Sequence, residues 1–213
     1  VITPDEGGGP RVSIYSGKDG AVLANFFAID DPNFRGGARA AAGDVNGDDT
    51  PDLVVSAGFG GGPRIAVYDG TSLGGTPTKL MNDFFAFEQA LRNGAYVAVG
   101  DLSGDGKADL VFGGGPGGGP RVLALDAVKL MGGDMAGAAL ANFFAGNQDN
   151  RGGVRVVAKN LDGDAMMDVV VGDGAGAGSR VTGYLGKNLG AGTPPAQASF
   201  DAFPGFLGGV FVG

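Results

Sequence analysis

One pattern of nine residues recurs along this chain of 213 residues. Its copies begin at Asp44, Asp101 and Asn160, and each places oxygen-bearing side chains at positions 1, 3, 5 and 9. Position 7 would add a backbone carbonyl oxygen. A calcium ion takes six to eight oxygen ligands at short range, and a tight loop with this spacing can supply them. Because the copies are in register, the pattern predicts a repeat protein whose repeats are each built on a metal loop.

The candidate ligands all lie in these three loops. They are Asp44, Asn46, Asp48, Thr50 and Asp52; Asp101, Ser103, Asp105, Lys107 and Asp109; and Asn160, Asp162, Asp164, Met166 and Asp168. Thr50, Lys107 and Met166 would contribute only their carbonyl oxygens. In the third loop Asn160 replaces the first Asp and Ala165 replaces a Gly, so we expect weaker binding there. We predict about three Ca²⁺ ions per chain.

Two other interpretations of the loops fit less well. An EF-hand needs a Glu at position 12 and a helix on each side, but Val55, Phe112 and Val171 stand there and the flanks resemble strands. A metal-free turn is compatible with Asp, Asn and Gly, which favour turns in any case. Three carboxylates within nine residues would then repel one another without compensation, so metal binding is the better interpretation.

Composition excludes several classes of function. The chain has no Cys and no His, so thiol nucleophiles, disulfides and imidazole-based triads are absent, and zinc lacks its usual ligands. The net charge of −8 argues against nucleic-acid binding. No apolar run is long enough for membrane insertion. The 45 glycines fall in phase with the repeat, and so indicate turns and close approaches rather than disorder.

Four kinds of short apolar segment recur around the loops, bounded by Gly, Pro, Asn or Asp, which is typical of strands. The first spans 38–43, 95–100 and 154–159, and the second begins at Asp52, Asp109 and Asp168. The third begins at Arg11, Arg64, Arg121 and Arg180. The fourth contains Phe26-Phe27, Phe84-Phe85 and Phe143-Phe144, with a degenerate copy at Phe200. These aromatic pairs are predicted to lie in the core.

Four antiparallel strands per repeat predict an all-β chain folded as one four-bladed β-propeller over residues 1–213. Three blades would span about 38–88, 95–146 and 153–205. The fourth would be shared between the termini, with residues 1–30 supplying three strands and 208–213 the remaining one. Pairing of these segments would close the ring and hide two sheet edges. Because Val1 already lies in a strand, the chain is interpreted as a mature product or a fragment.

The loops and their flanks resemble the FG-GAP repeat (VCBS-type) family, which includes the integrin α-subunit propeller and many secreted bacterial proteins. The matching stretches are Gly43 to Val54 and Gly100 to Val111. Gly61-Gly-Pro63 and Gly118-Gly-Pro120 replace the Gly-Ala-Pro element of the family. The resemblance implies that Ca²⁺ binds between the first two strands of each blade. It also implies an extracellular or cell-surface location.

Three functions remain to be weighed. The first is a non-catalytic structural, adhesion or protein-interaction module, which binds a protein partner or assembles with copies of itself. The second is a lectin-like module for polysaccharide, although the chain has no Trp and only four Tyr for stacking on sugars. The third is an enzyme, but the recurring carboxylates are committed to metal. A fragment of a larger FG-GAP propeller is an alternative for the whole chain.

Arginines are predicted to gather at the end of the blades opposite the metal loops. They are Arg11, Arg35, Arg64, Arg92, Arg121, Arg151 and Arg180. They would either bind an anionic partner or pair with neighbouring blades as part of the scaffold.

Overall fold

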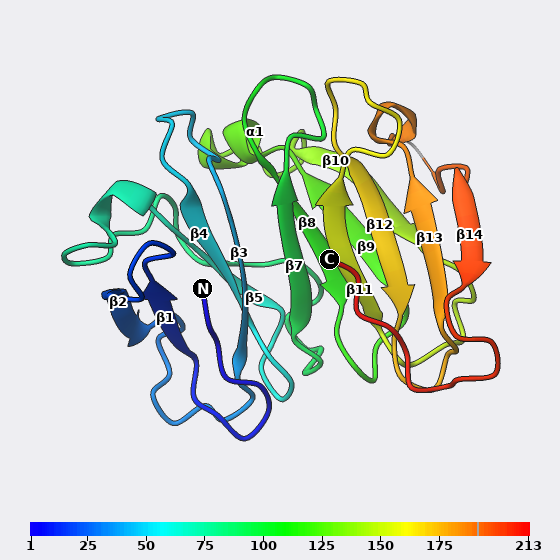
Figure 1. Ribbon diagram of the computed structural model, residues 1–213, viewed down its shortest axis with the longest axis horizontal. Helices are drawn as coiled ribbons and strands as arrows, with labels where there is room; N and C mark the ends of the chain where they lie inside the picture. The colour runs from blue at the N-terminus through cyan, green and yellow to red at the C-terminus, as the bar shows by residue number, and fades with distance from the viewer. Residues whose placement is uncertain (191) are drawn as a thin grey trace.

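Antiparallel strands make up most of the regular structure. A computed structural model describes residues 1–190 and 192–213 of the chain (Figure 1). Three sheets have four strands each, and a further sheet near the N-terminus has two. The all-β prediction is therefore confirmed, as are the four antiparallel strands of the three complete repeats.

The sheets are named here in chain order. The N-terminal sheet consists of β1 (Arg11–Tyr15) and β2 (Val22–Phe27). The first sheet consists of β3 (Ala38–Gly43), β4 (Asp52–Ala57), β5 (Arg64–Tyr68) and β6 (Phe84–Phe85). The second consists of β7 (Ala95–Gly100), β8 (Asp109–Gly114), β9 (Arg121–Leu125) and β10 (Ala139–Phe144). The third consists of β11 (Val154–Lys159), β12 (Asp168–Asp173), β13 (Arg180–Tyr184) and β14 (Ala198–Asp201).

Helical structure in the described residues is limited to single turns that follow the third strand of each complete sheet. They are the 3-10 turn η1 (Gly70–Ser72), the helix α1 (Ala127–Met131) and the 3-10 turn η2 (Gly186–Asn188). Among the described residues, none of these helices has the length and apolar character needed to cross a bilayer.

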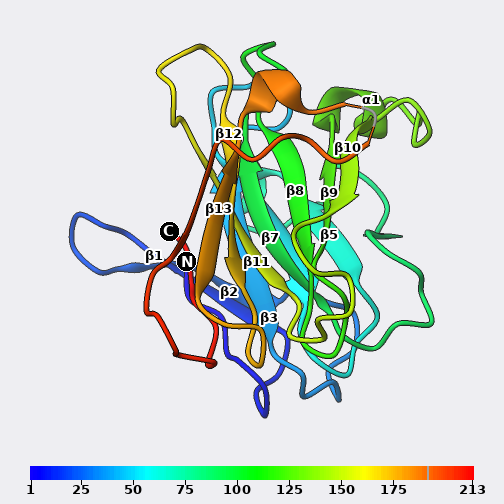
Figure 2. The same ribbon diagram turned by 90° about the vertical axis from the view of Figure 1, so that its right-hand side faces the viewer.

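The four sheets stand side by side in chain order (Figures 1 and 2). The first strands of the complete sheets, β3, β7 and β11, contact one another in series. A buried apolar cluster fills each junction: between the N-terminal and first sheets, between the first and second, and between the second and third. Each sheet is therefore stabilised mainly by its neighbours, as expected for stacked repeats.

Glycine makes these junctions possible because the backbones of neighbouring sheets come very close. Gly153 has a φ of +71°, and a Cβ atom there would lie 2.4 Å from the carbonyl oxygen of Gly114. Only glycine tolerates both conditions. The high glycine content thus follows from the packing of the sheets as well as from the turns.

The prediction that both rings of each Phe pair are buried is wrong for the second ring. Phe143 is 4% exposed, whereas Phe144 is 37% exposed. Successive side chains of a strand point to opposite faces. The fourth strand lies at the outer edge of its sheet, where only one face is covered by the neighbouring sheet.

The two ends of the chain take the places predicted for them, but the four-bladed ring is not confirmed. Ile2 pairs with Ser13 as a second strand would, and the N–H of Val210 donates to the carbonyl of Asp173 as a following first strand would. Among the described residues, no bridge or backbone hydrogen bond joins residues 1–2 to 210–212. No sheet closes on itself, because the two segments are attached to opposite ends of the row of sheets.

Candidate metal centre

The three predicted metal loops lie along one edge of the molecule. They connect β3 to β4, β7 to β8 and β11 to β12, and all three are found at the upper edge of Figure 1. Each connection joins two antiparallel strands that pair in full register up to the loop. The strands therefore hold the loops of successive repeats in equivalent positions.

In the first loop, the side chain at position 1 organises the backbone. Oδ1 of Asp44 accepts hydrogen bonds from the N–H groups of Gly47 (2.6 Å) and Asp48 (3.2 Å), and Oδ2 accepts one from Asp49 (2.8 Å). The second loop repeats this geometry, since Asp101 accepts from Gly104, Asp105 and Gly106. The backbone is thus already wound around the carboxylate.

The aspartate at position 9 of each loop is almost completely buried: Asp52 is 0% and Asp109 is 1% exposed. Oδ2 of Asp52 accepts from Val45 (3.0 Å) and Oδ1 from Gly70 (2.8 Å). Asp109 and Asp168 make the equivalent bonds, to Leu102 and Ala127 and to Leu161 and Gly186. This residue therefore ties the metal loop to the start of η1, α1 or η2. The sequence pattern did not reveal that second contact.

Burial and hydrogen bonding shift the pKa values of the loop carboxylates in opposite directions. Burial raises the pKa of Asp52 and of Asp109, although backbone N–H groups stabilise both carboxylates. The exposed Asp48 accepts a hydrogen bond of 3.0 Å from Asn46, and its pKa lies below the usual value mainly for that reason. Positions 3 and 5 of the first loop thus already contact each other.

No ready-made cluster of three or more acidic side chains able to hold a metal exists in residues 1–190 and 192–213. The carboxylates instead hold N–H groups of their own loops. The donor chemistry still fits a hard cation, because the side chains at positions 1, 3, 5 and 9 of the first two loops offer only carboxylate, amide and hydroxyl oxygens. In the second loop, the buried Oγ of Ser103 has no hydrogen-bond partner among the described residues. A ligand oxygen without a partner is consistent with a cation-binding role.

Neighbouring loops are joined by backbone hydrogen bonds. The carbonyl of Asp44 accepts from the N–H of Ala108 (2.8 Å), and the carbonyl of Asp101 accepts from Met167 (2.6 Å). Position 1 of one loop therefore contacts position 8 of the next. A rearrangement in one loop would be transmitted to its neighbour through this bond.

The third loop differs from the other two in charge. Asn160 accepts from Gly163 (2.6 Å) and donates to the carbonyl of Asp164 (2.6 Å), so its amide is engaged within the loop. Lys187 forms ion pairs with Asp162 and Asp164. The hydrogen bond from Lys187 lowers the pKa of Asp162. An ammonium group thus lies among the predicted ligands of this loop, which sequence reasoning missed.

The arginines at the opposite end are mostly engaged within the protein. Arg64 pairs with Asp83 (2.5 Å), and Arg121 pairs with Glu88 (2.9 Å). Arg180 also forms an ion pair, with Asp201. Arg11 donates a hydrogen bond to Asn25, and Arg35 and Arg151 donate to backbone carbonyls of their own loops. Of the two interpretations of this cluster, these contacts favour the scaffold over an anion site.

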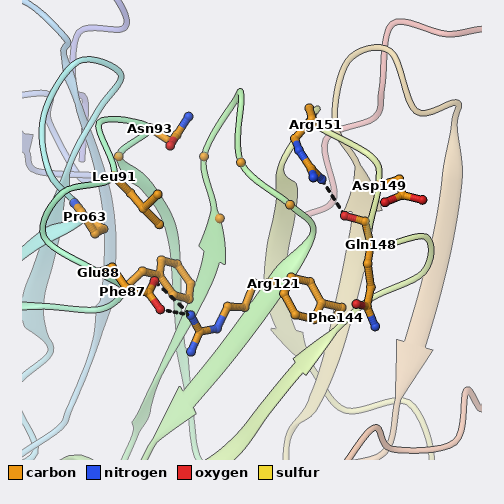
Figure 3. Close-up of a pocket in the computed structure, with 15 residues that line it drawn as sticks. Pro63, Phe87, Glu88, Leu91, Asn93, Arg121, Phe144, Gln148, Asp149 and Arg151 are labelled. Atoms are coloured by element: carbon orange, nitrogen blue, oxygen red, sulfur yellow. Dashed lines mark hydrogen bonds and ion pairs between the residues drawn. The ribbon is translucent and has the colours of Figure 1, made fainter.

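A cavity of about 440 Å³ opens at this end between the first and second sheets (Figure 3). Its wall combines the apolar side chains of Phe87, Leu91 and Phe144 with the Arg121–Glu88 ion pair. The guanidinium of Arg121 lies 5.3 Å from the centre of the Phe87 ring. The sequence did not predict this cavity, because its lining comes from connections of several repeats that are far apart in the chain.

The fold and loops together define a class: an all-β protein of stacked four-stranded repeats, each with an acidic loop between its first two strands. Residues 44–112 match the family model described as FG-GAP-like repeat. That range begins at the first loop and ends in β8. Residues 44–112 are therefore similar to an FG-GAP-like repeat, and the resemblance found in the sequence is confirmed over that range.

Two solved structures are similar over most of the chain. A crystal structure of the rhamnogalacturonan lyase YesW matches 96% of this chain and 38% of its own, with 16% identity and a TM-score of 0.49. The Bacillus licheniformis rhamnogalacturonan lyase PL11 matches 92% of this chain and 43% of its own, with 17% identity and a TM-score of 0.49. The chain thus spans less than half the length of either lyase. No curated protein matches its sequence.

Proposed function

We propose that the chain is a calcium-binding, non-catalytic β-propeller-type repeat module of an extracellular or cell-surface protein, which binds a protein partner or copies of itself. The observation that carries the proposal is the recurrence of an all-oxygen donor set at one edge of successive sheets. The first two loops supply Asp44, Asn46 and Asp48, and Asp101, Ser103 and Asp105. Extracellular calcium is abundant enough to fill loops of modest affinity.

Calcium would act on the fold rather than on a substrate. Each loop gathers several carboxylates, which repel one another when no cation is bound. A bound ion removes that repulsion and adds stability that grows with the ratio of calcium concentration to Kd. Because the loops are joined through the Asp44–Ala108 and Asp101–Met167 hydrogen bonds, ion binding would also stiffen the row of sheets.

A specific observation favours polysaccharide as the alternative partner. The cavity between the first and second sheets presents the ring of Phe144, which is 37% exposed, beside the polar side chains of Asn93 and Gln148. An exposed ring next to hydrogen-bonding groups can hold a sugar. A glycan array with the wild-type chain and the Phe144→Ala variant tests this; binding that is lost in the variant would replace the protein-partner proposal.

Thermal unfolding in calcium and in excess chelator tests the calcium role. We expect a higher melting temperature in calcium, with magnesium as the control because it binds such cages reluctantly. The variant Asp48→Asn with Asp105→Asn removes a charge from each of two exposed carboxylates and should lose most of the calcium-dependent shift. Equal melting temperatures of the wild-type chain in calcium and chelator would contradict the assignment.

A further inference from the structure

Neighbouring sheets pack through an aromatic contact at equivalent positions. Phe26 of β2 meets Tyr68 of β5, with ring centres 5.0 Å apart and planes at 71°. Phe143 of β10 meets Tyr184 of β13 at 4.9 Å and 68°. These edge-to-face pairs link the fourth strand of one repeat to the third strand of the next. Each pair thus shows which side chain of one sheet packs against which side chain of the next.

At the C-terminal end, the same position has no aromatic partner within the described part of the chain. Phe200 of β14 pairs with Val181, just as Phe143 pairs with Val122 in the second sheet. Phe200 is nevertheless 58% exposed, whereas Phe143 is 4% exposed. We call the surface made by Phe200, Leu161 and the segment 210–212 the C-terminal face. Leu161 is 47% exposed, while its counterpart in the second loop, Leu102, is 2% exposed.

The N-terminal end shows the other half of the junction. Tyr15 ends β1 as Tyr68 ends β5 and Tyr184 ends β13. It is 44% exposed, against 4% for Tyr68 and 5% for Tyr184. Ile2, which pairs with Ser13 of β1, is also exposed, and it forms no second bridge with any residue that the structure describes. We call the surface made by Tyr15 and Ile2 the N-terminal face.

Tyr15 and Phe200 lie on sheets that are not neighbours within one chain, although Thr3 and Asp5 line one cavity with Phe211 and Val212. The first and second sheets stand between the N-terminal and third sheets, which lie at opposite sides of Figure 1. The Phe–Tyr contact is nonetheless found at two of the three internal junctions, and at the middle one Phe84 meets Phe112 of β8 instead. Exposed apolar surface with such a matching counterpart indicates an interface.

We infer that the C-terminal face of one chain packs against the N-terminal face of a second copy, with Phe200 on Tyr15. The inference rests on the proposed function and deepens it, because it names the partner. The contact is head to tail, so it either closes when two copies satisfy both faces or continues along a filament. Calcium in the loops would lower the repulsion between chains that each carry a net charge of −8.

Sedimentation velocity over a concentration series, on the full chain in calcium, tests the inference. We expect concentration-dependent association of the wild-type chain and monomers for Phe200→Asp or Tyr15→Asp alone. A mixture of the two variants should form a one-to-one pair, because one junction then keeps both native residues. Phe59→Asp is the matched control: it also removes a 40%-exposed ring, but one that lies outside both faces, and it should associate like the wild type.

Melting curves of every variant in calcium and in chelator separate the two proposals. If calcium raises the melting temperature but the wild-type chain is monomeric throughout, the second copy is the wrong partner and the faces serve another occupant, such as further repeats. If both single variants associate like the wild type, or their mixture forms no pair, the inference is also overturned. If calcium leaves the melting temperature unchanged, the proposed function itself fails.

Discussion

The ammonium nitrogen of Lys187 lies 3.6 Å from a carboxylate oxygen of Asp164. It also donates a hydrogen bond to Asp162, and that bond raises the pKa of Lys187 above its ordinary value. Lys187 is the second residue of η2. The second residues of η1 and α1 are Thr71 and Val128, which carry no charge. In residues 1–190 and 192–213, the third loop is therefore the one with a positive charge of the protein in contact with two of its predicted calcium ligands.

Replacing Lys187 by Thr should strengthen calcium binding to the third loop. A cation entering that loop must displace the ammonium group from its carboxylates, and ligand charge tunes the affinity of calcium loops. Calorimetric titration in a background of Asp48→Asn with Asp105→Asn, which removes from the other two loops the position-5 carboxylate that the third loop keeps as Asp164, would isolate this loop, and we expect a several-fold tighter Kd. Lys18→Thr removes the same charge far from the loop and should leave the Kd unchanged. Equal affinities for Lys187→Thr and its parent would contradict the competition.

Asp109 and Asp105 should differ in what they do without calcium. Both carboxylate oxygens of the buried Asp109 accept hydrogen bonds from backbone N–H groups. In an Asn at this position, the side-chain NH₂ would face one of those N–H groups, and neither group could accept. We expect Asp109→Asn to lower the free energy of unfolding by about 1–3 kcal/mol in calcium and in chelator alike. Among the residues that the structure describes, the exposed Asp105 accepts a hydrogen bond only from the N–H of Lys107 (2.9 Å), so Asp105→Asn should act mainly in calcium.

Urea unfolding of both variants under the two conditions measures this difference. A wild-type free energy of unfolding for Asp109→Asn in chelator would show that its buried hydrogen bonds are not structural. A large loss for Asp105→Asn in chelator would show that position 5 is needed without the ion.

Removing residues 208–213 should destabilise the third sheet. Val210 is buried, its N–H donates to Asp173 (2.9 Å), and its carbonyl accepts from Arg155 (3.2 Å). Loss of one buried Val costs about 2 kcal/mol, which corresponds to about 4–8 °C in melting temperature for a chain of this size. Phe211→Ala is the control: the ring is 79% exposed and lies 4.1 Å from the guanidinium of Arg155. Its loss should cost no more than about 1 kcal/mol. A truncated chain that melts like the wild type would show that the C-terminal segment is not docked in solution.

Local features of the sequence determined the strands and loops. The segments predicted at 38–43, 95–100 and 154–159 are β3, β7 and β11, with the same bounds. The strands predicted to begin with Arg11 and Arg64 do so. Strand alternation, turn glycines and the spacing of oxygen ligands each depend on a few neighbouring residues, and the sequence contains that information directly. The same holds for the donor chemistry of the metal loops.

The tertiary structure alone decided how these pieces meet. Lys187 reaches the third loop from η2, and Asp109 reaches across to α1, and neither contact follows from the nine-residue pattern. The row of sheets leaves Tyr15 and Phe200 at opposite ends, where the sequence had predicted a closed ring. The angle between successive sheets arises from many small contacts across each junction, and no local period encodes it. Ring closure and the two exposed faces are therefore properties of packing between repeats.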